Sequence, residues 1–136
     1  MASVLNFPRR EAQAIGLIGF AHMLSHLYPL ALPVLLALIT SDLGLTKLQW
    51  GTALAVFAVT TGVLQTPMGL LVERAGGRRV LLFGMLVFST GIFCVGWLTD
   101  SYWALLLFMA ITGIGNSVFH PADYSLLSSS VDEERI

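Results

Sequence analysis

The chain has 136 residues, of which 56% are hydrophobic and only 11% are charged. Soluble globular domains carry about 25% charged residues, so this composition is typical of a membrane protein. The net charge of −1 argues against nucleic acid as a partner, because binding to phosphates needs a strongly basic surface.

Four segments are long and apolar enough to cross a membrane as helices. A helix needs roughly 20 mostly apolar residues to span the hydrocarbon core of a bilayer. Polar or glycine-containing stretches separate the four segments, which lie at about 12–40, 50–72, 79–98 and 103–130. The sequence therefore predicts an all-α, polytopic membrane protein with no room for a soluble domain, so that residues 1–136 form a single transmembrane domain.

The lysine and arginine residues of the short loops predict the orientation of the chain. Positive residues accumulate on the cytoplasmic side of a membrane protein. Arg9 and Arg10 precede the first segment, three arginines follow the second, and Arg135 follows the fourth, whereas only Lys47 lies on the opposite side. We therefore expect a multi-pass protein of the cell (inner) membrane, with both termini and the loop at 73–79 in the cytoplasm.

That loop belongs to a longer pattern that begins inside the second segment. The spacing is G-x-L-x-[D/E]-R-x-G-x-R-R, formed by Gly69, Leu71, Glu73, Arg74, Gly76, Arg78 and Arg79. It closely resembles the cytoplasmic loop between the second and third helices of major facilitator superfamily (MFS) transporters. The stretch NSVFHP at 116–121 is most similar to the fosmidomycin-resistance-type drug efflux branch of that superfamily.

The resemblance implies that the chain is the N-terminal four-helix portion of a twelve-helix fold. The expected partner of the chain is then the remainder of the transporter, with its further helices. The resemblance also implies transport of a small organic solute or drug by alternating access, driven by an ion or proton gradient. In the family, the acid of this loop engages a helix N-terminus of the other half, where a carboxylate gains up to about 2 kcal/mol. We therefore expect Glu73 and the loop around it to act as a conformational latch, with Gly69 allowing close helix packing and Gly76 making the turn.

The chain departs from the family pattern at three positions. The acid of the loop is Glu73 rather than the more usual aspartate, and Gly77 stands where an arginine is common. Met109 lies four residues before Gly113, where many drug/proton antiporters of the family carry a membrane-embedded arginine. Coupling through that arginine is therefore not available to this chain.

Polar side chains inside the apolar segments predict a transport pathway, because such groups usually face a bundle interior or an aqueous cavity. In each helix they share one face, and counting along the helices places them in two layers. One layer lies near the midplane and one nearer the cytoplasm: His26, Thr61 and Asn116, then His22, Gln65, His120 and Asp123. We expect the first, second and fourth helices to line this pathway and the third to lie at the periphery.

Asp123 and His120 are the candidate proton carriers, since an imidazole titrates near pH 6.5 in model peptides. Alternatively, Asp123 pairs with Arg78 or stays hydrated near the cytoplasmic surface, and the amides of the pathway only bond neighbouring helices. His22 and His26 lie one turn apart, but two nitrogens without a third ligand are weak evidence for a metal. We expect no metal and no other cofactor.

Two other functions are compatible with parts of the sequence. Gly115 and Ser117 form the G-x-S spacing of intramembrane serine proteases, but these enzymes need about six helices and have no role for the 73–79 loop, so we expect no enzymatic activity. A complete four-helix multidrug exporter would carry a glutamate deep in its first helix, where this chain has His22 and His26. A scaffold that transports nothing would have little use for two layers of polar residues.

Overall fold

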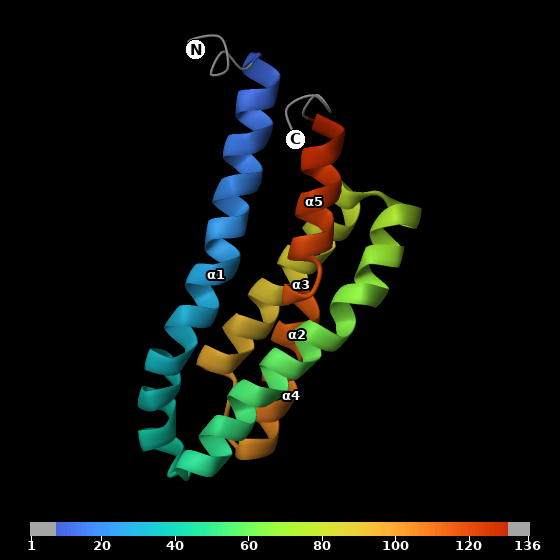
Figure 1. Ribbon diagram of the computed structural model, residues 1–136. Coiled ribbons are helices and arrows are strands. Elements are labelled where there is room, and N and C mark those ends of the chain that lie inside the picture. The colour runs from blue at the N-terminus through green and yellow to red at the C-terminus, as the bar shows by residue number, and fades with distance from the viewer. Residues whose placement is uncertain (1–7, 131–136) are drawn as a thin grey trace.

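The computed structural model describes residues 8–130, and within that range the chain is helical and contains no strand (Figure 1). The helices are α1 (Arg9–Leu43), α2 (Lys47–Ala75), α3 (Gly77–Trp97), α4 (Tyr102–Asn116) and α5 (Phe119–Ser130). Four stretches are long and apolar enough to cross a membrane: Glu11–Val34, Lys47–Ala75, Gly77–Trp97 and Tyr102–Ser130. The predicted all-α class with four spans is confirmed. Arg135, used above for the orientation, lies outside the described residues.

The fourth span consists of two helices rather than the single helix expected over 103–130. α4 ends at Asn116 and α5 begins at Phe119, with Ser117 and Val118 between them. Pro121 explains the new start, because proline has no amide hydrogen to donate back to Ser117 and is tolerated in the first turn of a helix. Figure 1 shows α5 continuing in the general direction of α4, so the two together cross the bundle.

Local sequence sets the ends of the helices. Gly44 ends α1 in the left-handed conformation with φ 62°, which glycine adopts without steric cost. Thr46 and Gln49 form a capping box at the start of α2, each side chain accepting a hydrogen bond from the other's backbone amide. Ser101 caps α4 in the same manner by accepting from the amide of Ala104.

The fourth span is the centre of the bundle. α4 packs against α2 and α3, whereas α5 contacts α1, α2 and α3. Leu105, Met109 and Thr112 on α4 are fully buried. The antiporter arginine position therefore holds a methionine that packs in the core, and this position gives no polar group to a pathway.

Glycines allow α4 to lie very close to its neighbours, as is common where membrane helices pack. A Cβ atom at Gly91 of α3 would overlap Thr112, and one at Gly115 of α4 would overlap Phe88. On the other side of α4, a Cβ at Gly113 would lie 2.8 Å from the backbone oxygen of Phe57 in α2. These contacts fix the position of the fourth span, and with it the position of the polar groups on α5.

Candidate functional site

α1 and α5 bring three histidines and an aspartate together, and we call His22, His26, His120 and Asp123 the histidine cluster. Nδ1 of His22 lies 2.8 Å from Oδ2 of Asp123. Nε2 of His26 lies 3.2 Å from Nε2 of His22, one turn away on the same helix. The cluster thus joins residues 101 positions apart through a continuous chain of hydrogen bonds.

His120 completes the cluster through its ring. Its ring centre lies 5.3 Å from that of His22 and 5.8 Å from that of His26, and the two α1 rings are 4.8 Å apart. The sequence placed His26 in one layer and the other members in a second, but the structure gathers all of them at one site. The hydrogen bond between His26 and His22 connects the two layers.

Asp123 is the most buried member of the cluster. Its side chain is 6% exposed, whereas that of His22 is 39% exposed. Oδ1 of Asp123 is buried and has no hydrogen-bond partner among the described residues. Because an unpaired charge in an apolar interior is costly, the single bond to His22 is the main local compensation for an ionised Asp123.

Among the described residues, Asp123 pairs with His22 and forms no ion pair with Arg78, whereas the alternative that Asp123 stays hydrated is not tested. Arg78 is exposed at the start of α3, and Asp123 is buried against His22. The orientation of α5 explains this result, because α5 directs Asp123 to α1 while it packs another face on α3. Counting residues along one helix gives a depth, but it does not identify the neighbouring helix.

The remaining predicted pathway residues have no printed bond to the cluster. Thr61 of α2 donates from its hydroxyl to the backbone oxygen of Gly113, at 3.3 Å. Asn116 is half-buried, and its side-chain oxygen is buried without a partner in the described part of the chain. Gln65 is also half-buried. The bundle therefore places Thr61 at the α2–α4 contact, and a role for these three residues in the pathway stays a prediction.

A pocket of about 420 Å³ adjoins the histidine cluster on its cytoplasmic side in the predicted orientation, and we call it the inner pocket. His22, His120 and Asp123 supply its polar wall. Its other lining residues are mostly apolar: Ile15, Ile18, Gly19, Tyr124 and Leu127. Sequence reasoning missed them, although Ile15, Ile18 and Gly19 share with His22 the helical spacing of a single stripe. The pocket offers an apolar ligand environment beside a carboxylate.

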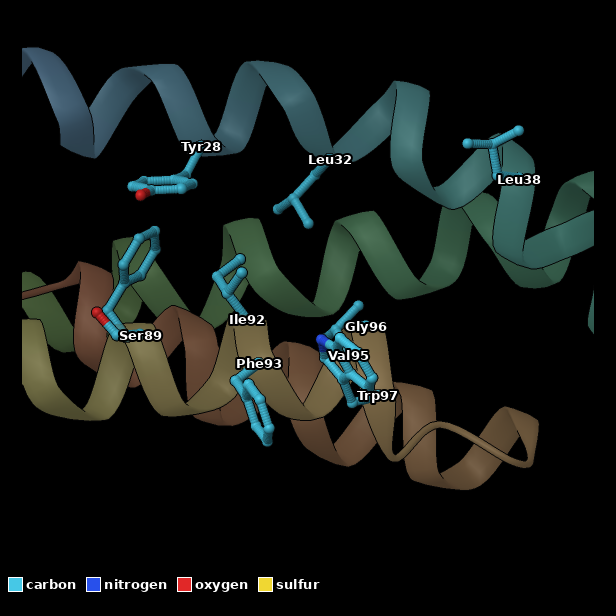
Figure 2. Close-up of a pocket in the computed structure, with 10 residues that line it drawn as sticks. Tyr28, Leu32, Leu38, Ser89, Ile92, Phe93, Val95, Gly96 and Trp97 are labelled. Atoms are coloured by element: carbon cyan, nitrogen blue, oxygen red, sulfur yellow. The ribbon is translucent and has the colours of Figure 1, made fainter.

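A second pocket lies between α1 and α3, with a volume of about 510 Å³ (Figure 2). Tyr28 and Leu32 project into it from α1, opposite Ile92 of α3. The rings of Tyr28 and Phe88 lie 5.7 Å apart at one end of this space. No member of the histidine cluster lines it, so the cluster and this apolar space are separate features of the described structure.

The loop between α2 and α3 is short, and its charged side chains are exposed. These are Glu73, Arg74, Arg78 and Arg79. Gly76 has φ 86° and ψ 138°, so it makes the turn with a positive φ, as expected, but outside the left-handed helical region. Glu73 forms no ion pair with the residues that the structure describes, and its predicted contact with another half is not tested.

Gly77, rather than Gly69, makes the close helix contact in this loop region. A Cβ at Gly69 would lie 3.9 Å from Pro121, an ordinary contact distance. A Cβ at Gly77 would lie 3.2 Å from the backbone oxygen of Ala122, within the first turns of α5. The position at which the family commonly has an arginine is therefore crowded by α5, which favours glycine there.

Comparison with known proteins decides the family. The sequence profile of the Major Facilitator Superfamily matches residues 14–136. The chain belongs to this superfamily. The MFS consists of transporters and not enzymes, and the buried Ser117 bonds to the backbone oxygen of Ile114 rather than to a histidine. The chain is thus a multi-pass membrane protein of a transporter family, and in the described structure Ser117 has no hydrogen bond to a histidine such as the protease alternative requires.

Curated MFS proteins of bacteria are similar to the chain over most of its length. The inner membrane transport protein YajR of Escherichia coli K12 is 31% identical over 107 residues, 79% of this chain and 23% of YajR. The fosmidomycin resistance protein of the same strain is 29% identical, over 79% of this chain and 26% of its own. The probable L-galactonate transporter is 28% identical, over 88% and 26%. No solved structure matches.

The chain therefore spans about a quarter of the length of the curated relatives it matches. These MFS relatives have different named functions at similar identity. The predicted kinship with the fosmidomycin-resistance-type branch in particular stays a prediction.

Proposed function

We propose that the chain forms the first four helices of an MFS transporter that moves a small organic solute or drug by alternating access. The gradient of protons drives this transport. The observation that carries the proposal is the histidine cluster, in which a buried carboxylate on one membrane helix is hydrogen-bonded to an imidazole on another. Intramembrane groups of this kind are typical of proton relays in transporters.

The geometry supports a carrier better than a scaffold. The inner pocket places the cluster beside about 420 Å³ of space lined mainly by apolar side chains. An organic solute with an apolar body and one polar group matches such a site, because apolar walls favour its body and the cluster orients its polar end. The missing helices of the transporter would close the open side of this site.

The exposed loop between α2 and α3 supports alternating access. Glu73 and the arginines near it are exposed on the side predicted to be cytoplasmic, where a second half of the transporter can contact them. A carboxylate that binds a helix N-terminus in only one conformation stabilises that conformation. Glu73 then acts as the latch between inward-open and outward-open states.

Transport by the intact protein in inverted membrane vesicles tests this function. The names of the relatives suggest fosmidomycin and L-galactonate for a panel. Tetracycline is the third compound, because the class G tetracycline resistance protein of Vibrio anguillarum is 34% identical over 100 residues. We expect an imposed proton gradient to drive accumulation of at least one of them, and a protonophore to abolish it. Accumulation that ignores the protonophore would contradict proton coupling, and absence of transport for a broad set of organic solutes would contradict the carrier function.

The variant Asp123→Asn identifies the residue that couples transport to protons. We expect it to lower gradient-driven transport by about a hundredfold, the usual scale for loss of a proton-transferring group. Asp100→Asn is the matched control, because Asp100 is exposed in the loop between α3 and α4. Gradient-driven transport that survives in Asp123→Asn would exclude this carboxyl as the proton site.

A further inference from the structure

Asp123 is buried, so under the proposed proton coupling, on which this inference rests, a proton must reach it through neighbouring groups. We infer that His26, His22 and Asp123 form a directional proton relay. His26 takes up the proton at its exposed end, His22 passes it on, and Asp123 receives it in the buried end beside the inner pocket. The ring of His120 lies beside the rings of His22 and His26, but no hydrogen bond joins His120 to them in the described structure.

The two short contacts assign a hydrogen position to each ring. An ionised carboxylate only accepts hydrogen bonds, so Nδ1 of His22 carries a hydrogen and donates it to Oδ2 of Asp123 over 2.8 Å. A neutral imidazole has one N–H, which leaves Nε2 of His22 as an acceptor. The 3.2 Å contact is then a bond donated by Nε2–H of His26. Both ring nitrogens of His22 therefore take part in the hydrogen bonds of the relay.

This arrangement transfers one proton through two bonds. A proton binds the free Nδ1 of His26, which gives up its Nε2 hydrogen to Nε2 of His22. His22 in turn gives its Nδ1 hydrogen to Oδ2 of Asp123. Two N–H bonds break and three new bonds to hydrogen form, including the one with the incoming proton. The products are a neutral carboxylic acid and two neutral imidazoles with their hydrogens on the opposite nitrogens.

The exposed fraction of the side chains falls along the relay, and the direction that we infer follows this order. His26 is exposed in the described bundle, the side chain of His22 is 39% exposed, and that of Asp123 is 6% exposed. Oδ1 of Asp123 has no partner among the described residues, which suits the neutral acid better than the ion, since a buried charge needs donors. The relay thus ends in a group that its surroundings accommodate once it is protonated.

Few other titratable groups surround the relay. On α5 these are His120 and Tyr124, which line the inner pocket with Asp123. The charged side chains at the α2–α3 loop are exposed and form no ion pair with the cluster in the part of the chain that the structure describes. Asn116 of α4 and Gln65 of α2 are neutral. The proton therefore has a defined route through three named groups.

The assignment of hydrogens is tested by ¹⁵N NMR of the intact transporter in lipid bilayers, with ¹⁵N in its histidine rings. The measurement varies only the pH and needs no transported compound. Above the pH at which Asp123 ionises, we expect one histidine with hydrogen on Nδ1, and its signal is absent in His22→Asn. On acidification the hydrogen of His22 moves to Nε2, while that of His26 moves to Nδ1. A His22 that carries its hydrogen on Nε2 at every pH would overturn the relay.

A glutamine at position 26 separates proton transfer from hydrogen bonding. The amide nitrogen of His26→Gln can replace Nε2 as a donor to His22, but an amide does not pass a proton on. With pyranine-loaded liposomes and the three panel compounds, we expect substrate-linked proton movement to fall at least about tenfold, with substrate binding retained. In His26→Ala, we expect added imidazole to restore the substrate-linked proton movement. Met23→Gln, an exposed position on α1, is the matched control and keeps wild-type movement.

The outcomes separate the relay from the proposed function. If His26→Gln moves protons as fast as the wild type, or loses substrate binding together with proton movement, the relay is wrong while proton coupling stands. If the wild type moves no protons with any transported compound, the proposed coupling is wrong, and the NMR measurement still decides whether the three groups exchange hydrogens as described.

Discussion

At the scale of single residues, the main feature is a carboxylate that has only one hydrogen-bond partner. Asp123 is buried, and His22 is its sole bonded neighbour in the described structure. Leaving a buried polar group without any partner costs about 1–3 kcal/mol, more for a charged one. His22 therefore stabilises the bundle through this bond, in addition to its role in the proposed relay.

A pair of substitutions at position 22 measures that contribution. His22→Leu removes the donor to Asp123, whereas His22→Asn keeps a donor in place of Nδ1. We expect His22→Leu to lower the free energy of unfolding in detergent by about 1–3 kcal/mol and His22→Asn to recover most of it. Chemical denaturation of both variants checks this at a pH where Asp123 is ionised. Equal stabilities would mean that the bond to Asp123 has no net effect.

At the scale of the elements, glycines decide how closely the helices pack. α3 approaches α4 where Gly91 faces Thr112 and Gly115 faces Phe88, and a methyl group at either glycine has no room. By contrast, a Cβ at Gly96, also on α3, meets nothing within 4 Å. Gly91 and Gly96 thus have different roles on the same helix, and only the residues packed against them reveal the difference.

These two glycines give a matched pair of alanine substitutions. Gly91→Ala is expected to destabilise the protein by about 1–3 kcal/mol, because overlap with the α4 backbone forces the helices apart. Gly96→Ala is expected to be neutral or to stabilise by up to about 1 kcal/mol, since alanine is the better helix former. Unfolding in a series of denaturant concentrations measures both. A Gly91→Ala protein as stable as Gly96→Ala would contradict the close α3–α4 contact.

At the scale of the whole molecule, the described helices leave charged groups exposed at one end and the histidine cluster near the middle. In a transporter with two halves, the first feature favours contact with the other half and the second favours the site of coupling. Glu73 is the acid through which we expect the loop to hold one conformation. Its charge, rather than its shape, is decisive for binding to the positive end of a helix.

The variants Glu73→Gln and Glu73→Asp test the latch. A cysteine at Ile18, which lines the inner pocket, reports its accessibility to a maleimide in a background with Cys94→Ser. Loss of a contact worth up to about 2 kcal/mol shifts the conformational equilibrium by up to about thirtyfold. We expect Glu73→Gln to change the labelling rate while ligand binding persists, and Glu73→Asp to resemble the wild type. Parallel loss of binding and transport in Glu73→Gln would count against the latch.

The sequence by itself determined the membrane class, the four spans and the family. Long apolar runs must form helices in hydrocarbon, where backbone groups cannot bond to water, and the pattern from Gly69 to Arg79 is local in the chain. The polar residues of the predicted pathway could be named as candidates for the same reason, since their cost in hydrocarbon does not depend on their neighbours. The orientation of the termini stays a prediction from loop charges.

Only the tertiary structure decided which of those residues meet. Asp123 bonds to His22 because α4 and α5 are held against the other helices by contacts such as Gly115 with Phe88, and no local pattern encodes that approach. The break after Asn116 turns α5 into a separate helix and so determines which helix Asp123 faces. Contacts between residues far apart in the chain depend on how whole helices pack, whereas helix formation in a membrane depends on each segment alone.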